Sequence, residues 1–80
     1  MTAGEIIENI EGLSRDRLTY SVRAGCVNPK KIKRRSLYFN EFSERDLSLI
    51  GRAWEYIYKH DMRTGAAFKR AERELAASPR

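Results

Sequence analysis

The residues of this 80-residue chain with the clearest chemical potential are cations that crowd into one short segment. The stretch NPKKIKRRSLYF, residues 28–39, places five Lys or Arg side chains in six consecutive positions. That density of positive charge favours an anionic partner, either the phosphates of a nucleic acid or membrane headgroups. The apolar residues Leu37, Tyr38, Phe39 and Phe42 end or follow this stretch. Because we expect such side chains to be buried, we assign the segment to a folded domain rather than to a tail.

The surplus of positive charge is confined to one part of the sequence. Residues 15–36 carry eight Lys or Arg and one acid, a net charge of +7, whereas the remaining residues carry eight bases and ten acids, a net charge of −2. Each phosphate that such cations neutralise releases counterions, so binding to a duplex would fall steeply with salt. A membrane surface is the weaker interpretation, because a basic interfacial helix needs its cations and a large apolar face on the same helix.

Other kinds of chemistry have little support in the sequence. Cys26 is the only cysteine, so neither a disulfide framework nor a thiol cluster for zinc is possible, and we predict no metal and no cofactor. His60 is the only histidine, and its place beside Asp61 favours a solvated residue at a helix end over a catalytic base. Because paired carboxylates and a glycine-rich phosphate loop are also missing from the pattern, we predict that the protein is not an enzyme.

The same sequence predicts a cytoplasmic, nucleoid-associated protein that has no contact with membranes. No stretch approaches the ~18 consecutive apolar residues of a membrane span. The N-terminus lacks the basic region and apolar run of a signal peptide.

Two short helices are predicted ahead of the basic stretch. Thr2 and Glu5 have the spacing of a capping box, in which each side chain satisfies the free backbone N–H of the other. Ser14 is a suitable N-cap for the second helix, and Gly25 is its expected C-cap. The pattern predicts a helix-turn-helix over about residues 2–25.

The basic stretch itself has no helical period. Its apolar positions suit two short strands over about residues 28–42, with Lys33, Arg34 and Arg35 at the tip of the loop between them. Two further helices are predicted over about residues 43–60 and 64–77, capped by Ser43 and Thr64. Their apolar stripes are Leu47, Ile50, Trp54 and Ile57 in the third helix and Phe68, Ala71 and Leu75 in the fourth. We therefore predict a single, mainly α domain, residues 1–80, with four helices and a two-stranded basic hairpin between the second and third.

The candidate binding site combines the second helix with the basic hairpin. About 100° per residue places Asp16, Thr19, Tyr20 and Arg23 opposite the apolar side of the helix. Such a face can enter a major groove, where arginine reads guanine, while cations at the start of the helix and on the hairpin suit phosphates or the minor groove. The predicted duplex-DNA site consists of Arg15, Asp16, Arg17, Thr19, Tyr20, Arg23, Lys30, Lys31, Lys33, Arg34 and Arg35.

Over about residues 2–76 the sequence resembles the winged helix-turn-helix DNA-binding domain of the mercury-resistance regulator (MerR) family. LTYSVRAGCVNPKK, residues 18–31, matches the end of that family's second helix with its glycine, proline and basic wing. FSERDL, residues 42–47, resembles the family's YSEEDL helix start, and HDM, residues 60–62, resembles its turn into the fourth helix. The resemblance implies a winged helix-turn-helix that binds duplex DNA in transcription control, with RNA polymerase as a candidate partner.

Four positions depart from the family pattern. Thr19 and Ser21 stand where an arginine and a second tyrosine are common, and Tyr38 and Asn40 stand where the wing has glycine and arginine. These are DNA-contacting or wing-shaping positions. The phosphate contacts would then be rebuilt in part from Lys30, Lys31, Arg34 and Arg35. Dimerisation would need weak contacts or the family's long helix, which would follow residue 76.

Two functions stay open at the level of sequence. The first is sequence-specific binding of duplex DNA. The alternative is a protein-interaction adaptor on the same scaffold, which would bind an acidic protein such as a co-chaperone or a polymerase subunit. Steep loss of binding with salt and preference for one duplex sequence would distinguish the first from the second.

Overall fold

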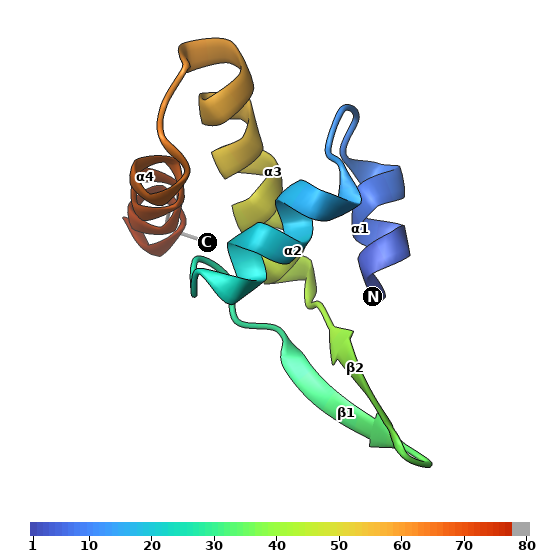
Figure 1. Ribbon diagram of the computed structural model, residues 1–80. Coiled ribbons are helices and arrows are strands. Elements are labelled where there is room, and N and C mark those ends of the chain that lie inside the picture. Colours follow the sequence, from blue (N-terminus) through green and yellow to red (C-terminus); the bar gives the residue numbers. More distant parts are fainter. Residues whose placement is uncertain (78–80) are drawn as a thin grey trace.

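The computed structural model describes residues 1–77 and shows four helices with one two-stranded antiparallel sheet. The elements, in chain order, are α1 (Ala3–Asn9), α2 (Arg15–Arg23), β1 (Lys30–Arg34), β2 (Leu37–Glu41), α3 (Glu44–His60) and α4 (Thr64–Ala77). In Figure 1, α2 crosses in front of α3, α1 and α4 lie on opposite sides of that crossing, and the two strands extend away from all four helices. The mainly helical class and the predicted order of elements are confirmed.

Both N-terminal helices begin with the caps that their sequences predict. The Thr2 hydroxyl accepts a hydrogen bond from the Glu5 N–H (3.2 Å), and the Glu5 carboxylate accepts one from the Thr2 N–H (2.8 Å). That backbone donor lowers the pKa of Glu5, because the hydrogen bond favours the ionised carboxylate. At α2 the Ser14 hydroxyl accepts from the Arg17 N–H (3.1 Å). Local side-chain chemistry therefore fixes where each helix starts.

The end of α2 is a Schellman motif. The Cys26 N–H donates to the Ser21 carbonyl (3.0 Å), and the Gly25 N–H donates to the Val22 carbonyl (3.1 Å). Gly25 has φ +78, the left-handed conformation that this motif requires and that glycine adopts without steric cost. The C-cap itself is Ala24, so the predicted C-cap is wrong by one residue, and Gly25 is the first residue after the cap.

The strands form a hairpin that we call the ribbon, residues Lys30–Glu41. Lys30 pairs with Glu41 at one end and Arg34 pairs with Leu37 at the other, which leaves a turn of two residues, Arg35 and Ser36. The predicted loop tip is therefore wrong for Lys33 and Arg34, which lie in β1. The hairpin is tighter than expected because Arg35 adopts a positive φ of 58°, which reverses the chain within two residues.

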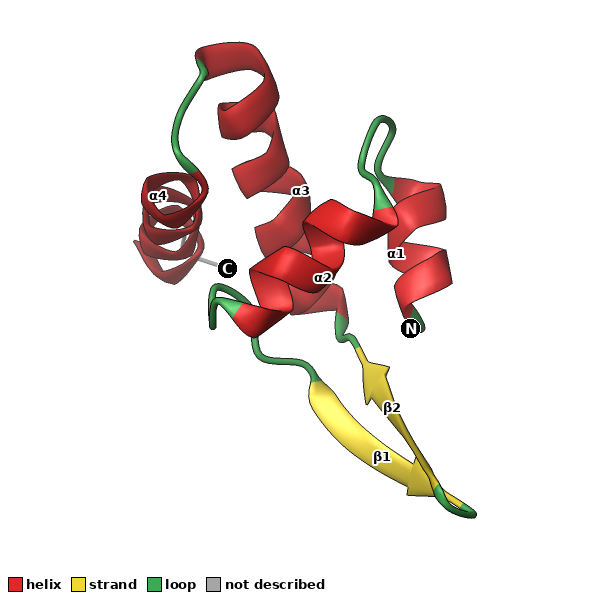
Figure 2. Ribbon diagram, in the orientation of Figure 1, coloured by secondary structure: helices red, strands yellow, loops and turns green. Residues whose placement is uncertain are grey.

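The expected burial of the hairpin's aromatic and aliphatic residues is wrong for three of four side chains. Leu37, Tyr38 and Phe39 keep 62%, 67% and 52% of their surface exposed, whereas Phe42, just after β2, is buried. The cause is visible in Figure 2, where the yellow strands project beyond the red helices and no other element covers their outer part. Leu37, Tyr38 and Phe39 therefore face solvent, whereas Ile32 in β1 is half-buried.

The core lies between the helices and extends to the base of the ribbon. On α3 the buried residues are Leu49, Ile50 and Ala53, whereas Leu47, Trp54 and Ile57 are only partly buried. The predicted stripe was therefore displaced to one side of the true buried face. The buried hydrophobic residues that make up the core are Ile6, Leu13, Leu18, Val27, Phe42, Leu49, Ile50, Ala53, Ala67, Phe68 and Ala71.

The second half of the chain follows the prediction more closely. Ser43 and Asp46 form a capping box at the start of α3, and Asp61, at φ 53°, ends that helix after His60. Thr64 is the first helical residue of α4 and not its N-cap, since the first α4 bond runs from the Ala67 N–H to the Arg63 carbonyl (2.9 Å). Within residues 1–77, none of the helices has both the length and the apolar character of a membrane span.

Candidate nucleic-acid interface

All eleven residues of the predicted DNA site are exposed. None of the eight cations among residues 15–36 has a carboxylate within 4.0 Å in the part of the chain that the structure describes. The ion pairs that are present lie on α3 and α4, and they join Arg52 and Arg70 to Glu74 and Lys59 to Glu55. Positive charge around α2 and the ribbon is therefore uncompensated by the protein, which leaves it available to an anionic partner.

The eleven residues do not all share one face of α2. Asp16, Thr19 and Arg23 lie opposite the buried Leu18 and point away from the helical core. Arg15 reaches the start of α1, since a Cβ added to Gly4 would lie 3.9 Å from its guanidinium. The outward face of α2 is thus narrower than the sequence suggested.

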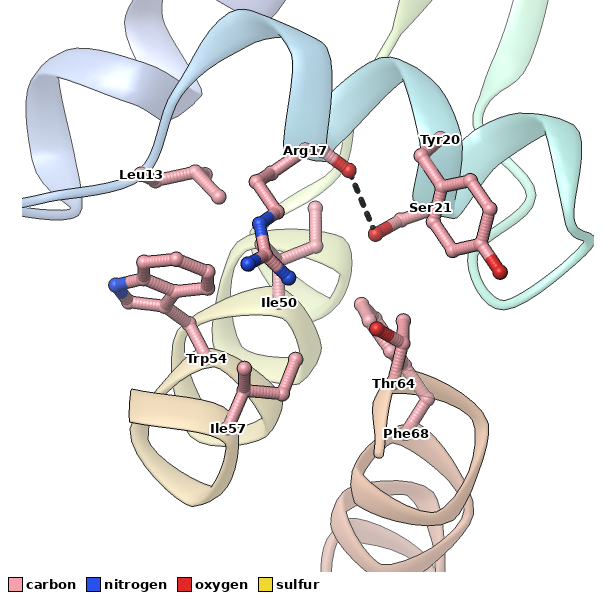
Figure 3. A pocket seen from close by; sticks show the side chains of 9 residues that line it. All are labelled: Leu13, Arg17, Tyr20, Ser21, Ile50, Trp54, Ile57, Thr64 and Phe68. Atoms are coloured by element: carbon pink, nitrogen blue, oxygen red, sulfur yellow. Dashed lines mark hydrogen bonds between the residues drawn. The ribbon is translucent and has the colours of Figure 1, made fainter. Parts of the chain in front are cut away.

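Arg17 and Tyr20 turn toward α3 and α4. The Arg17 guanidinium lies 5.6 Å from the centroid of the Trp54 ring, and Figure 3 shows it above that ring and beside Ile50. The cavity beneath these side chains measures only about 10 Å³, so it holds one water at most. Tyr20 stays 58% exposed on the same side of the helix. Both residues border the groove between α2 and the start of α4.

Trp54 has a positioning role that sequence reasoning missed. Its indole N–H donates to the Glu11 carbonyl (3.2 Å), which fastens the turn between α1 and α2 to α3. Its other neighbour is Tyr58, whose ring stacks on it at 6.1 Å between centroids. The sequence placed Trp54 on the core stripe, and nothing in the spacing along α3 indicates that an arginine from α2 will lie over its ring.

Arg63 is a second residue that the sequence analysis missed. It lies directly before α4 and borders the same groove as Arg17 and Tyr20. The free N–H groups of the first turn of α4 lie beside it, and they carry partial positive charge. The sequence did contain a signal for this residue, because Arg63 is a cation immediately before the predicted start of the fourth helix.

The pairing of the strands divides the ribbon into two faces. Residues that are directly opposite each other in an antiparallel pair share a face, and successive residues alternate. One face, which we call the basic face, carries Lys31, Lys33, Tyr38 and Asn40, with the Lys33 ammonium 5.7 Å from the centre of the Tyr38 ring. The other, the apolar face, carries Lys30, Ile32, Arg34, Leu37, Phe39 and Glu41. The register thus separates two of the predicted site residues, Lys30 and Arg34, from Lys31 and Lys33.

No cluster of three or more His, Cys, Asp or Glu side chains that could hold a metal ion is found within residues 1–77. Comparison of the chain with protein-family models, with curated proteins and with solved structures gives no match in any of the three. The resemblance to the MerR family therefore rests on the residues quoted above. A function has to be argued from the exposed cations and their arrangement.

Proposed function

We propose that the chain is a sequence-specific, duplex-DNA-binding domain of a MerR-like transcriptional regulator, built as a winged helix-turn-helix. In this proposal α1 and α2 are the helix-turn-helix, and the ribbon is the wing. The outer face of α2 enters the major groove, and the ribbon lies on the flanking phosphates or in the minor groove.

The observation that carries the proposal is the set of unpaired cations on two adjacent elements. Eight exposed Lys and Arg side chains lie on α2 and the ribbon, with no carboxylate partner among the described residues. A protein surface with so many uncompensated charges of one sign gains free energy from a polyanion, because each neutralised phosphate releases counterions. Of the seven cations among residues 37–77, three have a carboxylate partner, namely Arg52, Lys59 and Arg70.

The dimensions of the two elements fit a duplex. The nine residues of α2 span about 14 Å at 1.5 Å per residue, and a major groove about 12 Å wide admits a helix. A strand of five residues is about 17 Å long, close to ten times the ~1.7 Å spacing of charge along the duplex axis. Both elements can therefore meet several phosphates at once.

The side chains divide into two roles. Arg23 and Thr19 on the outer face of α2 are the candidates for reading base edges, since arginine pairs with guanine and threonine contacts a thymine methyl group. Arg17, held over Trp54, is a candidate phosphate contact, as is the previously unassigned Arg63 across the same groove. Phosphate contacts fix the register of the protein on DNA, and base contacts supply the specificity.

Selection of bound duplexes from a random pool at physiological salt tests the proposal. We expect one motif to be enriched, and titration of that duplex should shift the amide NMR signals of α2 and the ribbon. If no motif emerges and the shifts are confined to α3 and α4, the proposal is refuted.

An adaptor that binds a protein partner is supported by one specific observation. The exposed Leu37 and Phe39 contribute little to phosphate binding, yet they lie side by side on one face of the ribbon with Ile32. If DNA binds through the basic face of the ribbon, the apolar face remains free for a protein partner.

A further inference from the structure

The apolar face of the ribbon is unusual for an element that has only to bind phosphates. Ile32 pairs directly with Phe39, and Leu37 lies next to them on the same face. Leu37 and Phe39 are 62% and 52% exposed. A contiguous apolar patch on a small soluble domain marks an interaction site, because solvent exposure of such a patch is unfavourable and promotes aggregation.

This face forms one wall of a groove. The opposite wall is the start of α1, and the groove has a volume of about 370 Å³. Its boundary is fixed by two backbone hydrogen bonds, from the Met1 amino group to the Phe42 carbonyl and from the Phe42 N–H to the Met1 carbonyl, each 2.7 Å. The residues that line it are Met1, Thr2, Glu5, Ile32, Arg34, Phe39, Asn40 and Glu41.

The charges around the groove are ordered along its length. Glu41 lies at the base of the ribbon and Arg34 lies near its tip, with the Ile32–Phe39 pair between them. Glu5 is a second carboxylate at the α1 wall. An occupant that complements this order has an apolar centre, an acidic group toward the tip and a basic group toward the base.

A duplex does not fit these requirements. Its backbone is uniformly anionic, so Glu5 and Glu41 would repel it, and of the side chains that line the groove only that of Arg34 is a cation that attracts phosphate. A second copy of the chain is also unfavourable, because each ribbon carries five cations and one acid and two ribbons would repel each other. A protein segment with mixed charge and apolar side chains satisfies every part of the groove.

We propose that the groove between the ribbon and α1 binds a short amphipathic segment of another protein. Apolar side chains of that segment pack on Ile32 and Phe39, a carboxylate faces Arg34 and a cation faces Glu41. A strand of five residues is about 17 Å long, so roughly five residues of an extended peptide match its length. The basic face of the ribbon stays free, so peptide and duplex can bind together.

Selection from a displayed library of random peptides against the full chain tests this inference. Peptides of about 12 residues are longer than the ~17 Å strand, so they can cover the groove with flanking residues to spare. We expect the enriched peptides to carry apolar residues flanked by an acid on one side and a base on the other. Their dissociation constants are measured by fluorescence anisotropy, without DNA, so the result does not depend on the proposed function.

Variants on the two faces of the ribbon form a matched set. Phe39→Ser should weaken binding of the enriched peptides by about tenfold or more, the size of effect seen for a buried apolar anchor. Leu37→Ser should weaken the binding less than Phe39→Ser, because Leu37 is on the same face but does not line the groove. Tyr38→Ser is the control, because Tyr38 is as exposed as Leu37 but lies on the basic face, and it should change the affinity less than about twofold.

A charge reversal tests the direction of the bound peptide. Arg34→Glu should weaken the peptides selected on the original chain, and a peptide whose acid is replaced by lysine should recover the affinity. Affinity recovers only if the charge at position 34 lies close to the charge on the peptide, so a variant that has simply unfolded cannot show this recovery.

Several outcomes would overturn the inference. It fails if no peptide is enriched, or if Phe39→Ser and Tyr38→Ser have equal effects. It also fails if Phe39→Ser abolishes a dimer seen by analytical ultracentrifugation, since the occupant would then be a second copy. Competition between duplex and peptide at the apolar face would assign that face to DNA. Retained peptide binding with no duplex selectivity would refute the proposed function and leave this inference standing.

Discussion

Neutralising the two lysines on the basic face of the ribbon should weaken DNA binding far more than neutralising the two cations on the apolar face. The double variant Lys31→Gln and Lys33→Gln removes two charges from a face that carries no acid. The matched control, Lys30→Gln and Arg34→Gln, removes the same charge from the face that also carries Glu41. Both pairs lie in β1 and are exposed, so the two variants should have similar stability.

The size of the effect follows from counterion release. The logarithm of the binding constant falls with the logarithm of salt concentration with a slope of about −0.9 for each phosphate contact, so loss of two contacts changes the slope by about 1.8. If the two proteins bind alike near 1 M salt, the difference at about 0.1 M is 10 to the power 1.8, or roughly 60-fold. That factor corresponds to about 2.4 kcal/mol. The control should change the slope by less than half as much.

Fluorescence anisotropy with the selected duplex, over salt concentrations from about 0.05 to 0.3 M, gives the slopes directly. Unfolding in urea checks that both variants retain the stability of the original chain. Equal slopes for all three proteins would remove the ribbon from the DNA interface. A larger change in the control would mean that the apolar face is turned toward the duplex, and it would contradict the peptide-binding inference as well.

Three further predictions concern single residues. Arg23→Ala should cost about 1–3 kcal/mol with the preferred duplex and reduce discrimination at one base pair, measured by competition with single-base-pair variants; uniform weakening on all duplexes would argue against base reading. Gly25→Ala should destabilise the fold by about 1–2 kcal/mol in urea, because its φ of +78° opposes a side chain although no atom lies within 4 Å; Gly65→Ala, in helical conformation and equally open, should cost nothing. Tyr56→Phe should reduce the dependence of folding stability on acid pH. The Tyr56 hydroxyl donates to Glu74 and lowers the pKa of its carboxyl, so the contact stabilises the fold above about pH 4.5, and this stabilisation is lost as the pH falls. An acid unfolding profile that does not change would contradict the contact.

The starts of α1, α2 and α3 were predictable from the sequence because they depend on interactions over three residues. Thr2 with Glu5 and Ser43 with Asp46 each form a reciprocal cap, and both partners are visible in the sequence. Gly25 similarly identifies the end of α2, since the left-handed conformation restricts the choice of residue. Caps of this kind involve only residues close together in the sequence, so they can be predicted without knowing how the rest of the chain packs.

Burial of the hairpin could not be predicted in the same way. Leu37, Tyr38 and Phe39 have the residue types of a core, but their burial depends on whether another element covers the strands. The same limit applies to Arg17, which the sequence placed at a helix start for phosphate contact. Its position over Trp54 joins two helices that are far apart in the sequence, and only the packing of α2 against α3 brings them together.

The alternation of residue types along the ribbon connects the two proposals. In β1 the order is Lys31, Ile32, Lys33, so each successive side chain changes face, and in β2 the partners of the two lysines are Asn40 and Tyr38. A strand that served only to present charge would gain from polar residues between its cations. This ribbon has two β1 cations on each face, but only the basic face is free of acid, and the other face carries Ile32, Leu37 and Phe39 beside Glu41. An exposed apolar strand face increases the risk of aggregation, and a partner that covers it removes that cost. The register of five residue pairs therefore favours a two-sided element, one that holds a duplex on its basic face and a protein segment on its apolar face.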